Sequence, residues 1–274
     1  MLKEEKYRLN CKDVDSGITV IYDSDVAEKA LIVYIHGGGL LFGSRNDLPL
    51  KHRRAFTAAG YKLVCIDYPL APENRIETIL QSVIEQINAV FSKESADKPS
   101  FLFGRSAGAY LALLASCRGN LLHTPAGVIS YYGYGFLVDG WADVPSEYYN
   151  GFAKVDASCL DTVNSENFAN GYARYVYSRQ SGCWRDLISG GEKEEKCDTL
   201  RSYARLPCPL FCAHSMNDPD VPFSEFLALC ARFNPERFIT SSEMHDFDRN
   251  ENDRCVDRLL KATLSFCEKA IQRR

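Results

Sequence analysis

Short apolar runs alternate with helical patterns along most of this chain, and that alternation limits its possible folds more than any other feature. Residues 30–35 form a continuous apolar run, as expected for a strand that is buried on both faces. Further runs predict strands at 63–68, 101–103, 128–131, 210–213 and 237–240. We therefore expect an α/β fold with a mostly parallel central sheet and helices on both of its faces.

The predicted helices lie between these strands and after the last one. Apolar residues recur at helical spacing within them, so each presents one buried stripe. At the start of the chain, residues 7–11 and 18–22 instead predict an antiparallel hairpin with its turn at 15–17. The helices are expected at 47–59, 74–91, 107–117, 224–233 and 253–271.

The alternation breaks down over residues 132–205, which are rich in Tyr, Trp, Asn and Gly and show no clear strand pattern. A loop of that length without regular structure is implausible inside a compact domain. The segment is better explained as an inserted, largely helical cap. The predicted α/β core then consists of residues 1–131 and 206–274.

Many aromatic residues fall in this segment or at its start. They could line a substrate pocket, since aromatic walls with polar tips suit a modest acyl or aromatic substrate. They could also form the core of the cap itself, and we expect that most of them do. They are Tyr131, Tyr132, Tyr134, Phe136, Tyr148, Tyr149, Phe152, Tyr172, Tyr175, Tyr177 and Trp184.

Residues 104–108 read Gly-Arg-Ser-Ala-Gly and stand between a predicted strand and a predicted helix. This G-x-S-x-G spacing is typical of a hydrolase nucleophile, because a sharp strand-to-helix turn exposes the serine and leaves room only for small residues around it. The alternative is a glycine-rich turn whose serine caps the helix. We expect Ser106 to be a catalytic nucleophile.

His36-Gly37-Gly38-Gly39 follows directly on the predicted strand at 30–35. Hydrolysis of an acyl compound passes through a tetrahedral oxyanion, and glycines allow the backbone to turn N–H donors towards it. A phosphate-binding loop fits less well, because no Gly-Lys-Ser/Thr follows and the G-x-G-x-x-G spacing is absent. The loop therefore predicts an oxyanion hole.

A catalytic serine needs a base, and the base needs a carboxylate that orients it. His245 follows the last predicted strand, at the end of the sheet where the serine turn opens, and is the expected base. Asp218 follows the preceding strand and is the expected carboxylate, with Asp220 as the alternative. We expect the other histidines to be structural: His36, His52, His123 and His214.

The chain order Ser106, Asp218, His245 and the motifs above resemble the α/β-hydrolase superfamily over nearly the whole chain. The hormone-sensitive-lipase-like esterases are the most similar group: residues 36–39 look like their HGGG motif, and 67–73 like the segment that braces it. The resemblance implies oxyanion donors at Gly38, Gly39 and Ala107. At the turn around Ser106, Arg105 and Ala109 differ from the residues usual in that group. The loop that carries Asp218, residues 218–222 (the acid loop), resembles that of dienelactone-hydrolase-like and prolyl-peptidase-like relatives.

Three functions are compatible with these residues. The first is hydrolysis of small or medium carboxylic esters through an acyl-enzyme. The second is amide hydrolysis of a formamidase-like or peptidase-like kind, which would use the same triad. The third is a binding protein that keeps the fold without turnover, although such relatives usually lack a triad member and none is missing here.

Composition limits the partners. A net charge of −4 without basic clusters argues against nucleic acid, so we expect a small-molecule acyl substrate. The first residues contain no apolar signal region and no apolar run is long enough to span a membrane, so we expect a cytoplasmic protein. The 11 cysteines are scattered without a C-x-x-C pair. We expect neither a metal nor a cofactor, and the sequence does not indicate the oligomeric state.

Overall fold

A single eight-stranded sheet runs through the computed structural model, which describes residues 1–11, 14–94, 98–161, 168–191 and 199–274. The strand order is β1-β2-β4-β3-β5-β6-β7-β8. β1 and β2 pair antiparallel, as do β2 and β4, and every other pair is parallel. The strands are β1 Leu2–Cys11, β2 Val14–Asp23, β3 Ala30–Ile35, β4 Tyr61–Ile66, β5 Ser100–Arg105, β6 Gly127–Tyr131, β7 Leu210–Ser215 and β8 Glu236–Thr240.

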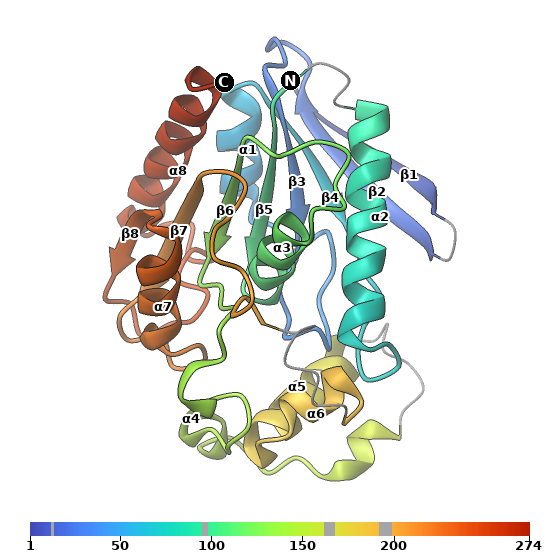
Figure 1. The fold of residues 1–274 in the computed structure, drawn as a ribbon, viewed down its shortest axis with the longest axis vertical. Coiled ribbons are helices and arrows are strands. Elements are labelled where there is room, and N and C mark those ends of the chain that lie inside the picture. The colour runs from blue at the N-terminus through green and yellow to red at the C-terminus, as the bar shows by residue number, and fades with distance from the viewer. Residues whose placement is uncertain (12–13, 95–97, 162–167, 192–198) are drawn as a thin grey trace.

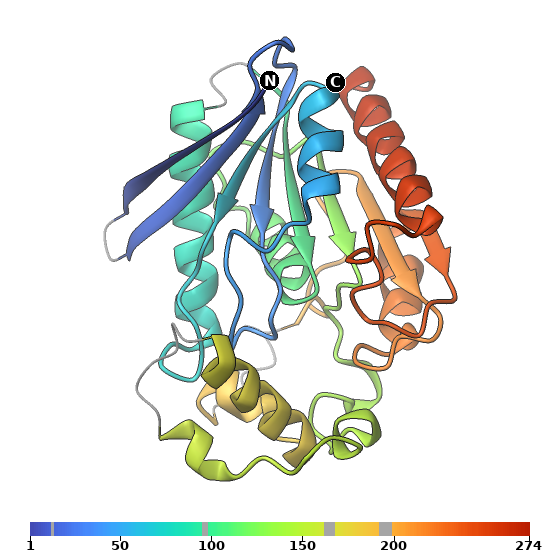
Figure 2. The same cartoon turned by 180° about the vertical axis from the view of Figure 1, so that it is seen from behind.

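Helices cover both faces of this sheet, and each face has its own buried core. Figure 1 shows one face, with α2 (Ile76–Glu94), α3 (Ala107–Arg118) and α7 (Phe223–Phe233). Figure 2 shows the other face, with α1 (Leu50–Ala58) and α8 (Arg254–Gln272). The mostly parallel sheet with helices on both faces that the sequence predicts is confirmed.

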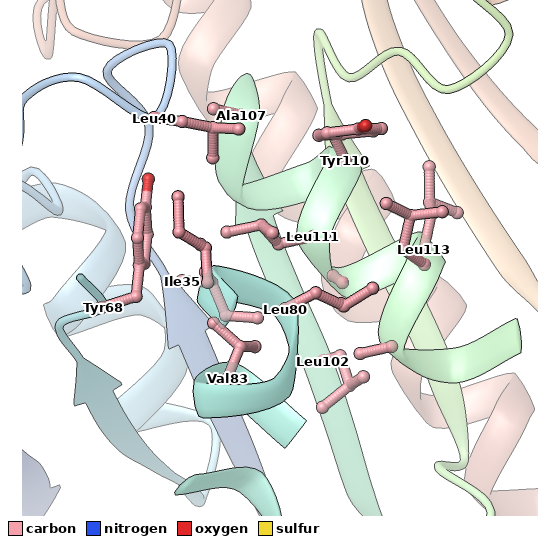
Figure 3. Packing of buried hydrophobic residues seen from close by; sticks show 14 of the residues in the cluster. Ile35, Leu40, Tyr68, Leu80, Val83, Leu102, Ala107, Tyr110, Leu111 and Leu113 are labelled. Carbon is pink, nitrogen blue, oxygen red and sulfur yellow. The ribbon is translucent and has the colours of Figure 1, made fainter. Parts of the chain in front are cut away.

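Side chains of the central strands alternate between the two cores, as the period of a strand requires. Along β3, Val33 and Ile35 belong to the core under α2 and α3, while Ile32 and Tyr34 belong to the core under α1 and α8. Figure 3 shows Leu80 and Val83 of α2 packed together with Leu111 of α3 and strand residues. All of these side chains are at most 1 % exposed, so the sheet is fixed firmly from both sides.

The segment 132–205 contains helices and no strand in the parts that the structure describes. α4 (Glu147–Asn150), α5 (Phe168–Ser181) and α6 (Trp184–Ser189) lie beyond the carboxyl ends of the parallel strands, and both chain termini lie at the opposite end of the molecule (Figure 1). Two short 3₁₀ turns, Val138–Gly140 and Ala157–Leu160, complete the described elements of this segment.

Two details differ from the sequence expectations. Residues 15–17 do not form the hairpin turn, because β2 begins at Val14 and pairs Ser16 with Leu9 and Gly17 with Arg8. β4 spans Tyr61–Ile66 instead of 63–68, because only these residues pair with β3. Asp67 and Tyr68 therefore lie in the loop beyond the strand, where their side chains reach the glycine-rich loop. Among the described residues, no helix combines the length and the apolar character that a membrane span requires.

Candidate active site

Ser106 occupies the turn between β5 and α3. Its φ of 51° and ψ of −119° lie outside the helical and strand regions, as expected where a strand reverses sharply into a helix. The backbone N–H of Ser106 donates to the Tyr131 carbonyl at 2.9 Å, which ties the turn to β6. The serine side chain is thus held at the N-terminus of α3, where the helix dipole favours negative charge.

The glycines on either side of Ser106 are required by close backbone contacts. A Cβ atom at Gly104 would lie 2.2 Å from the Ala109 nitrogen, and one at Gly108 would lie 2.0 Å from the Ile35 carbonyl oxygen. Strand β5, helix α3 and the end of β3 therefore approach one another too closely for any side chain at these two positions. This explains the G-x-S-x-G spacing physically.

His245 and Asp218 meet Ser106 at the carboxyl end of the sheet. His245 Nε2 lies 2.8 Å from the Ser106 Oγ, and His245 Nδ1 lies 2.7 Å from the Asp218 Oδ2. The other carboxylate oxygen, Asp218 Oδ1, accepts hydrogen bonds from the backbone N–H groups of Asp220 and Val221 at 2.9 and 3.0 Å. The three predicted residues thus form a continuous hydrogen-bonded chain.

The Asp218 carboxylate and the protonated imidazole of His245 stabilise each other's charge. Burial alone would lower the pKa of His245, but the adjacent Asp218 carboxylate raises it to about 9. Burial would likewise raise the pKa of Asp218, but the imidazole of His245 holds it below its ordinary value. Asp218 therefore stays ionised and favours the protonated form that His245 takes up when it accepts a proton.

Asp220, the alternative carboxylate, is directed elsewhere. It accepts hydrogen bonds from the hydroxyl groups of Tyr149 at 3.1 Å and Tyr175 at 2.8 Å, and it lies 3.4 Å from the Arg179 guanidinium. Asp220 contacts Asp218 through its backbone N–H, which donates a hydrogen bond to Asp218 Oδ1. Asp220 thus braces the segment 132–205 against the acid loop.

The glycine-rich loop after β3 presents free donors beside Ser106. Gly38 and Gly39 have φ values of 106° and 58°, which a residue with a Cβ adopts only at a cost. Within the described chain, neither N–H group of these two residues has a hydrogen-bond partner. The N–H of Ala107, at the first position of α3, has no partner within its helix. In the described residues, the three backbone N–H groups predicted to bind an oxyanion are therefore available to donate hydrogen bonds to it.

Neighbouring side chains hold this loop in place. The ring of Tyr68 stacks on the ring of His36 with centroids 4.1 Å apart, and its hydroxyl donates to the His36 carbonyl at 3.0 Å. Asp67 accepts from the backbone N–H of Arg45 at 2.6 Å and pairs with the Arg45 side chain. Trp184 of α6 donates its indole N–H to the Gly39 carbonyl at 2.8 Å.

Of the remaining histidines, only His214 contacts the predicted triad in the described residues. It lies within β7, contacts the Val221 carbonyl at 3.1 Å and lies 3.4 Å from Asp218 Oδ2. His123 stacks on Phe91. His52 of α1 lies 3.1 Å from the Asp248 carboxylate. None of them contacts Ser106 in the part of the chain that the structure describes.

Arg105, next to Ser106, belongs to a buried polar network that no sequence pattern predicted. Its guanidinium donates to the Tyr132 hydroxyl at 2.5 Å and to Asp248 Oδ1 at 2.8 Å. The Tyr132 hydroxyl also donates to Asp248 at 2.8 Å, and the Tyr132 ring packs edge-on against His245 at 4.7 Å. Despite its burial, the carboxylate of Asp248 keeps a pKa well below its ordinary value, because Arg105 and His52 stabilise its charge.

A cavity of about 470 Å³ opens above Ser106. Its walls come from the glycine-rich loop, the His245 loop and the segment 132–205. Of the aromatic residues singled out in the sequence, Tyr132, Tyr148, Tyr149, Tyr172 and Tyr175 line it. Others, such as Tyr134 and Trp184, are buried in the core instead. Tyr149 and Tyr175 do both, since they line the cavity and also belong to the buried core. Phe42 and Phe168 also line the cavity, and the sequence had not marked them.

In the described ranges, no three His, Cys, Asp or Glu side chains are grouped so that they could hold a metal ion.

Comparison with known proteins yields one family and several relatives. The model of a family described as having the alpha/beta hydrolase fold matches residues 32–204. A solved structure of a protein of unknown function from Staphylococcus aureus subsp. aureus Mu50 superposes with a TM-score of 0.85 at 29% identity, covering 97% of this chain and 99% of that one.

Two curated proteins match over shorter stretches. An esterase of Acinetobacter venetianus is 33% identical over 92 residues, which cover 32% of this chain and 29% of the esterase. A kynurenine formamidase of Salmo salar is 29% identical over 89 residues, which cover 31% of this chain and 28% of the formamidase. The matches thus span less than a third of either relative.

Proposed function

The chain belongs to the α/β-hydrolase family, and on that premise we propose that it is a serine hydrolase that cleaves small or medium carboxylic esters. The observation that carries the proposal is the contact of Ser106 Oγ with His245 Nε2 at 2.8 Å, continued by that of His245 Nδ1 with Asp218 at 2.7 Å. These atoms border a cavity of suitable size for a small substrate. The similarity to an esterase adds support.

In the proposed reaction, Ser106 Oγ attacks the ester carbonyl carbon while His245 Nε2 takes the hydroxyl proton. The carbonyl oxygen becomes an oxyanion and accepts hydrogen bonds from the N–H groups of Gly38, Gly39 and Ala107. The C–O bond to the alcohol then breaks, and the His245 proton passes to the leaving alkoxide. Asp218 keeps the imidazole oriented and stabilises its positive charge.

The acyl-enzyme that results is cleaved by water in a second round. His245 takes a proton from the water, the hydroxide adds to the acyl carbon, and the Ser106 oxygen leaves with the proton that His245 returns. We also propose that residues 132–205 form a cap that supplies one wall of the cavity. The tyrosines of this segment that line the cavity support that role.

Amide hydrolysis is the second candidate, favoured by the similarity to a kynurenine formamidase. Pre-steady-state kinetics on 4-nitrophenyl acetate and 4-nitroacetanilide separates the two. The ester hydrolase predicts a burst of nitrophenol equal to the enzyme concentration and a much slower reaction with the anilide. Faster turnover of the anilide would support the amidase, and no reaction with either compound would favour the binding protein.

A further inference from the structure

The apolar surface of the cavity is almost entirely aromatic. In the described chain, no Leu, Ile or Val side chain lines it, and Met244 is the only long aliphatic side chain that does. A pocket for long acyl chains would instead be expected to contain branched aliphatic side chains. Apart from Tyr132, whose hydroxyl is engaged by Arg105, the rings form what we call the aromatic wall: Phe42, Tyr148, Tyr149, Phe168, Tyr172 and Tyr175.

These rings are continuous from the oxyanion loop to the cavity mouth. Tyr175 lies against Gly39, where an added Cβ would meet its ring at 2.2 Å. The Phe42 ring lies 5.7 Å from that of Tyr175 and 5.5 Å from that of Tyr172, and Phe168 stacks parallel to Tyr172. A planar ring bound near Ser106 would therefore find aromatic partners at every depth.

The outer rings are left partly uncovered. Tyr148 is 45% exposed and Tyr172 is 39% exposed, although large apolar side chains are usually buried. The hydroxyl groups of Tyr149 and Tyr175 are satisfied by Asp220, whereas those of Tyr148 and Tyr172 have no partner in the described ranges. The mouth thus offers both ring faces and free hydroxyl groups.

The charges around the cavity disfavour anions. Arg105 is engaged by Tyr132 and Asp248, and Arg249 pairs with Asp246. Further carboxylates line the cavity: Asp47 lies 3.5 Å from both Arg105 and Arg249, Asp220 lies 3.4 Å from Arg179, and Glu243 is the third. Glu243 is exposed and pairs with no cation in the described chain. A substrate with a carboxylate would meet net negative charge at this surface.

We propose that the aromatic wall is an aryl subsite and that the substrates are neutral or cationic esters that carry an aromatic ring. The inference rests on the proposed ester hydrolysis and specifies its substrate class. A stacked ring that replaces a saturated ring of the same size should raise kcat/KM by about tenfold, the upper end of the range for aromatic pairs.

Matched ester pairs test this subsite. Methyl phenylacetate and methyl cyclohexylacetate differ only in the ring of the acyl part, and benzyl acetate and cyclohexylmethyl acetate differ only in the ring of the alcohol. We expect the aromatic member of at least one pair to be preferred by about tenfold in kcat/KM. In the benzyl acetate series, a 4-carboxylate on the ring should remove most of that preference.

The variant Tyr172→Leu should reduce the aromatic preference to less than about twofold, because it removes one stacking face. Tyr177→Leu is the matched control, since Tyr177 lies on the same helix but does not line the cavity. It should retain the preference. Equal turnover of aromatic and saturated members, together with normal turnover of ethyl acetate, would overturn the aryl subsite and leave the ester hydrolase intact. No turnover of any ester would overturn both.

Arg105, beside the proposed nucleophile, forms a buried ion pair with Asp248 at 2.8 Å. Asp248 lies in the loop that carries the proposed base, so the pair joins the two segments. Tyr132 contacts both members of the pair and the ring of His245. We infer that Arg105 is a positioning residue that sets the distance between Ser106 and His245 through Asp248 and Tyr132.

The double variant Arg105→Met/Asp248→Leu tests this role, because it removes both charges of the buried pair together. We expect its kcat to fall by about 100-fold with KM nearly unchanged, since small displacements of catalytic groups have effects of that order. Thr263→Val is the control: it removes a buried hydrogen bond to Tyr131 on the same face of the sheet and should leave kcat unchanged.

The single variant Arg105→Lys keeps a positive charge opposite Asp248, so its kcat should lie between those of the double variant and the wild type. If the double variant fails to fold, Tyr132→Phe provides the same test with a smaller change, and we expect its kcat to fall by about tenfold at constant KM. A folded double variant, or a Tyr132→Phe variant, with kcat within twofold of wild type would overturn the positioning role.

Discussion

At the scale of single residues, the proposed catalysis depends on the ionisation of His245. The imidazole acts as a base only when it is neutral, and Asp218 raises its pKa to about 9. The fraction of neutral imidazole therefore increases with pH through the neutral range and into the alkaline range. Activity should follow that fraction.

The pH dependence of kcat/KM tests this ionisation. We expect kcat/KM to rise with pH, with a midpoint at alkaline pH. Asp218→Asn should lower kcat by about 10⁴-fold, the effect known for the corresponding change in serine proteases. It should also move the midpoint to lower pH, because the burial that remains lowers the pKa of His245. A midpoint that stays in place or rises would contradict the role of Asp218.

The catalytic candidates were accessible from sequence because each stands in the segment that follows a strand at the carboxyl end of the sheet. Ser106, Asp218 and His245 were marked by local patterns and by chain order. Asp248 was not marked, because its relevance comes from a contact with Arg105, 143 residues away in sequence. Glycine spacing reports local backbone geometry, whereas a buried ion pair appears only once the elements are packed.

At the scale of elements, the turn from β5 to α3 depends on the absence of side chains at two glycines. Gly108→Ala should destabilise the protein by about 3 kcal/mol, because its Cβ would lie 2.0 Å from the backbone oxygen of Ile35, which cannot move without disturbing β3. Gly119→Ala is the control at the other end of α3, where no atom lies within 4 Å of the added Cβ.

That control should cost only about 1 kcal/mol, from its φ of 74°. Urea denaturation of both variants measures the difference. Equal destabilisation by the two substitutions would mean that contact with β3 does not restrict Gly108.

Element boundaries were predicted well where burial sets the pattern and less well at the edge of the sheet. β3 begins and ends at the predicted residues, because both of its faces are buried. The hairpin turn was misplaced, because β1 and β2 form a long antiparallel ladder through polar residues that resemble a turn in sequence.

At the scale of the whole molecule, stability should depend on pH in a manner set by the buried charges. Asp248 and Asp218 have pKa values below their ordinary values in the folded protein. Their contribution is therefore present above about pH 4, the range of an unperturbed Asp, and is lost as the pH falls further. The pKa of His245 is raised in the folded protein, so its contribution to stability is present at lower pH and is lost as the pH rises towards about 9.

Urea denaturation at a series of pH values checks this dependence. We expect the free energy of unfolding to be greatest between about pH 4 and 6.5 and to decrease on both sides. The variant Arg105→Met/Asp248→Leu should show a shallower decrease on the acid side, because it lacks the Asp248 carboxyl. An unchanged acid slope would contradict the contribution of the buried pair.

We propose that Ser106 is a nucleophile activated by His245 and Asp218. Reaction of the purified protein with a fluorophosphonate, followed by peptide mass spectrometry, tests it most directly. We predict one covalent adduct on the peptide that contains Ser106, no adduct in Ser106→Ala, and a strongly slowed reaction in His245→Ala. A wild-type protein that stays unlabelled, or that is labelled at another residue, would contradict the account.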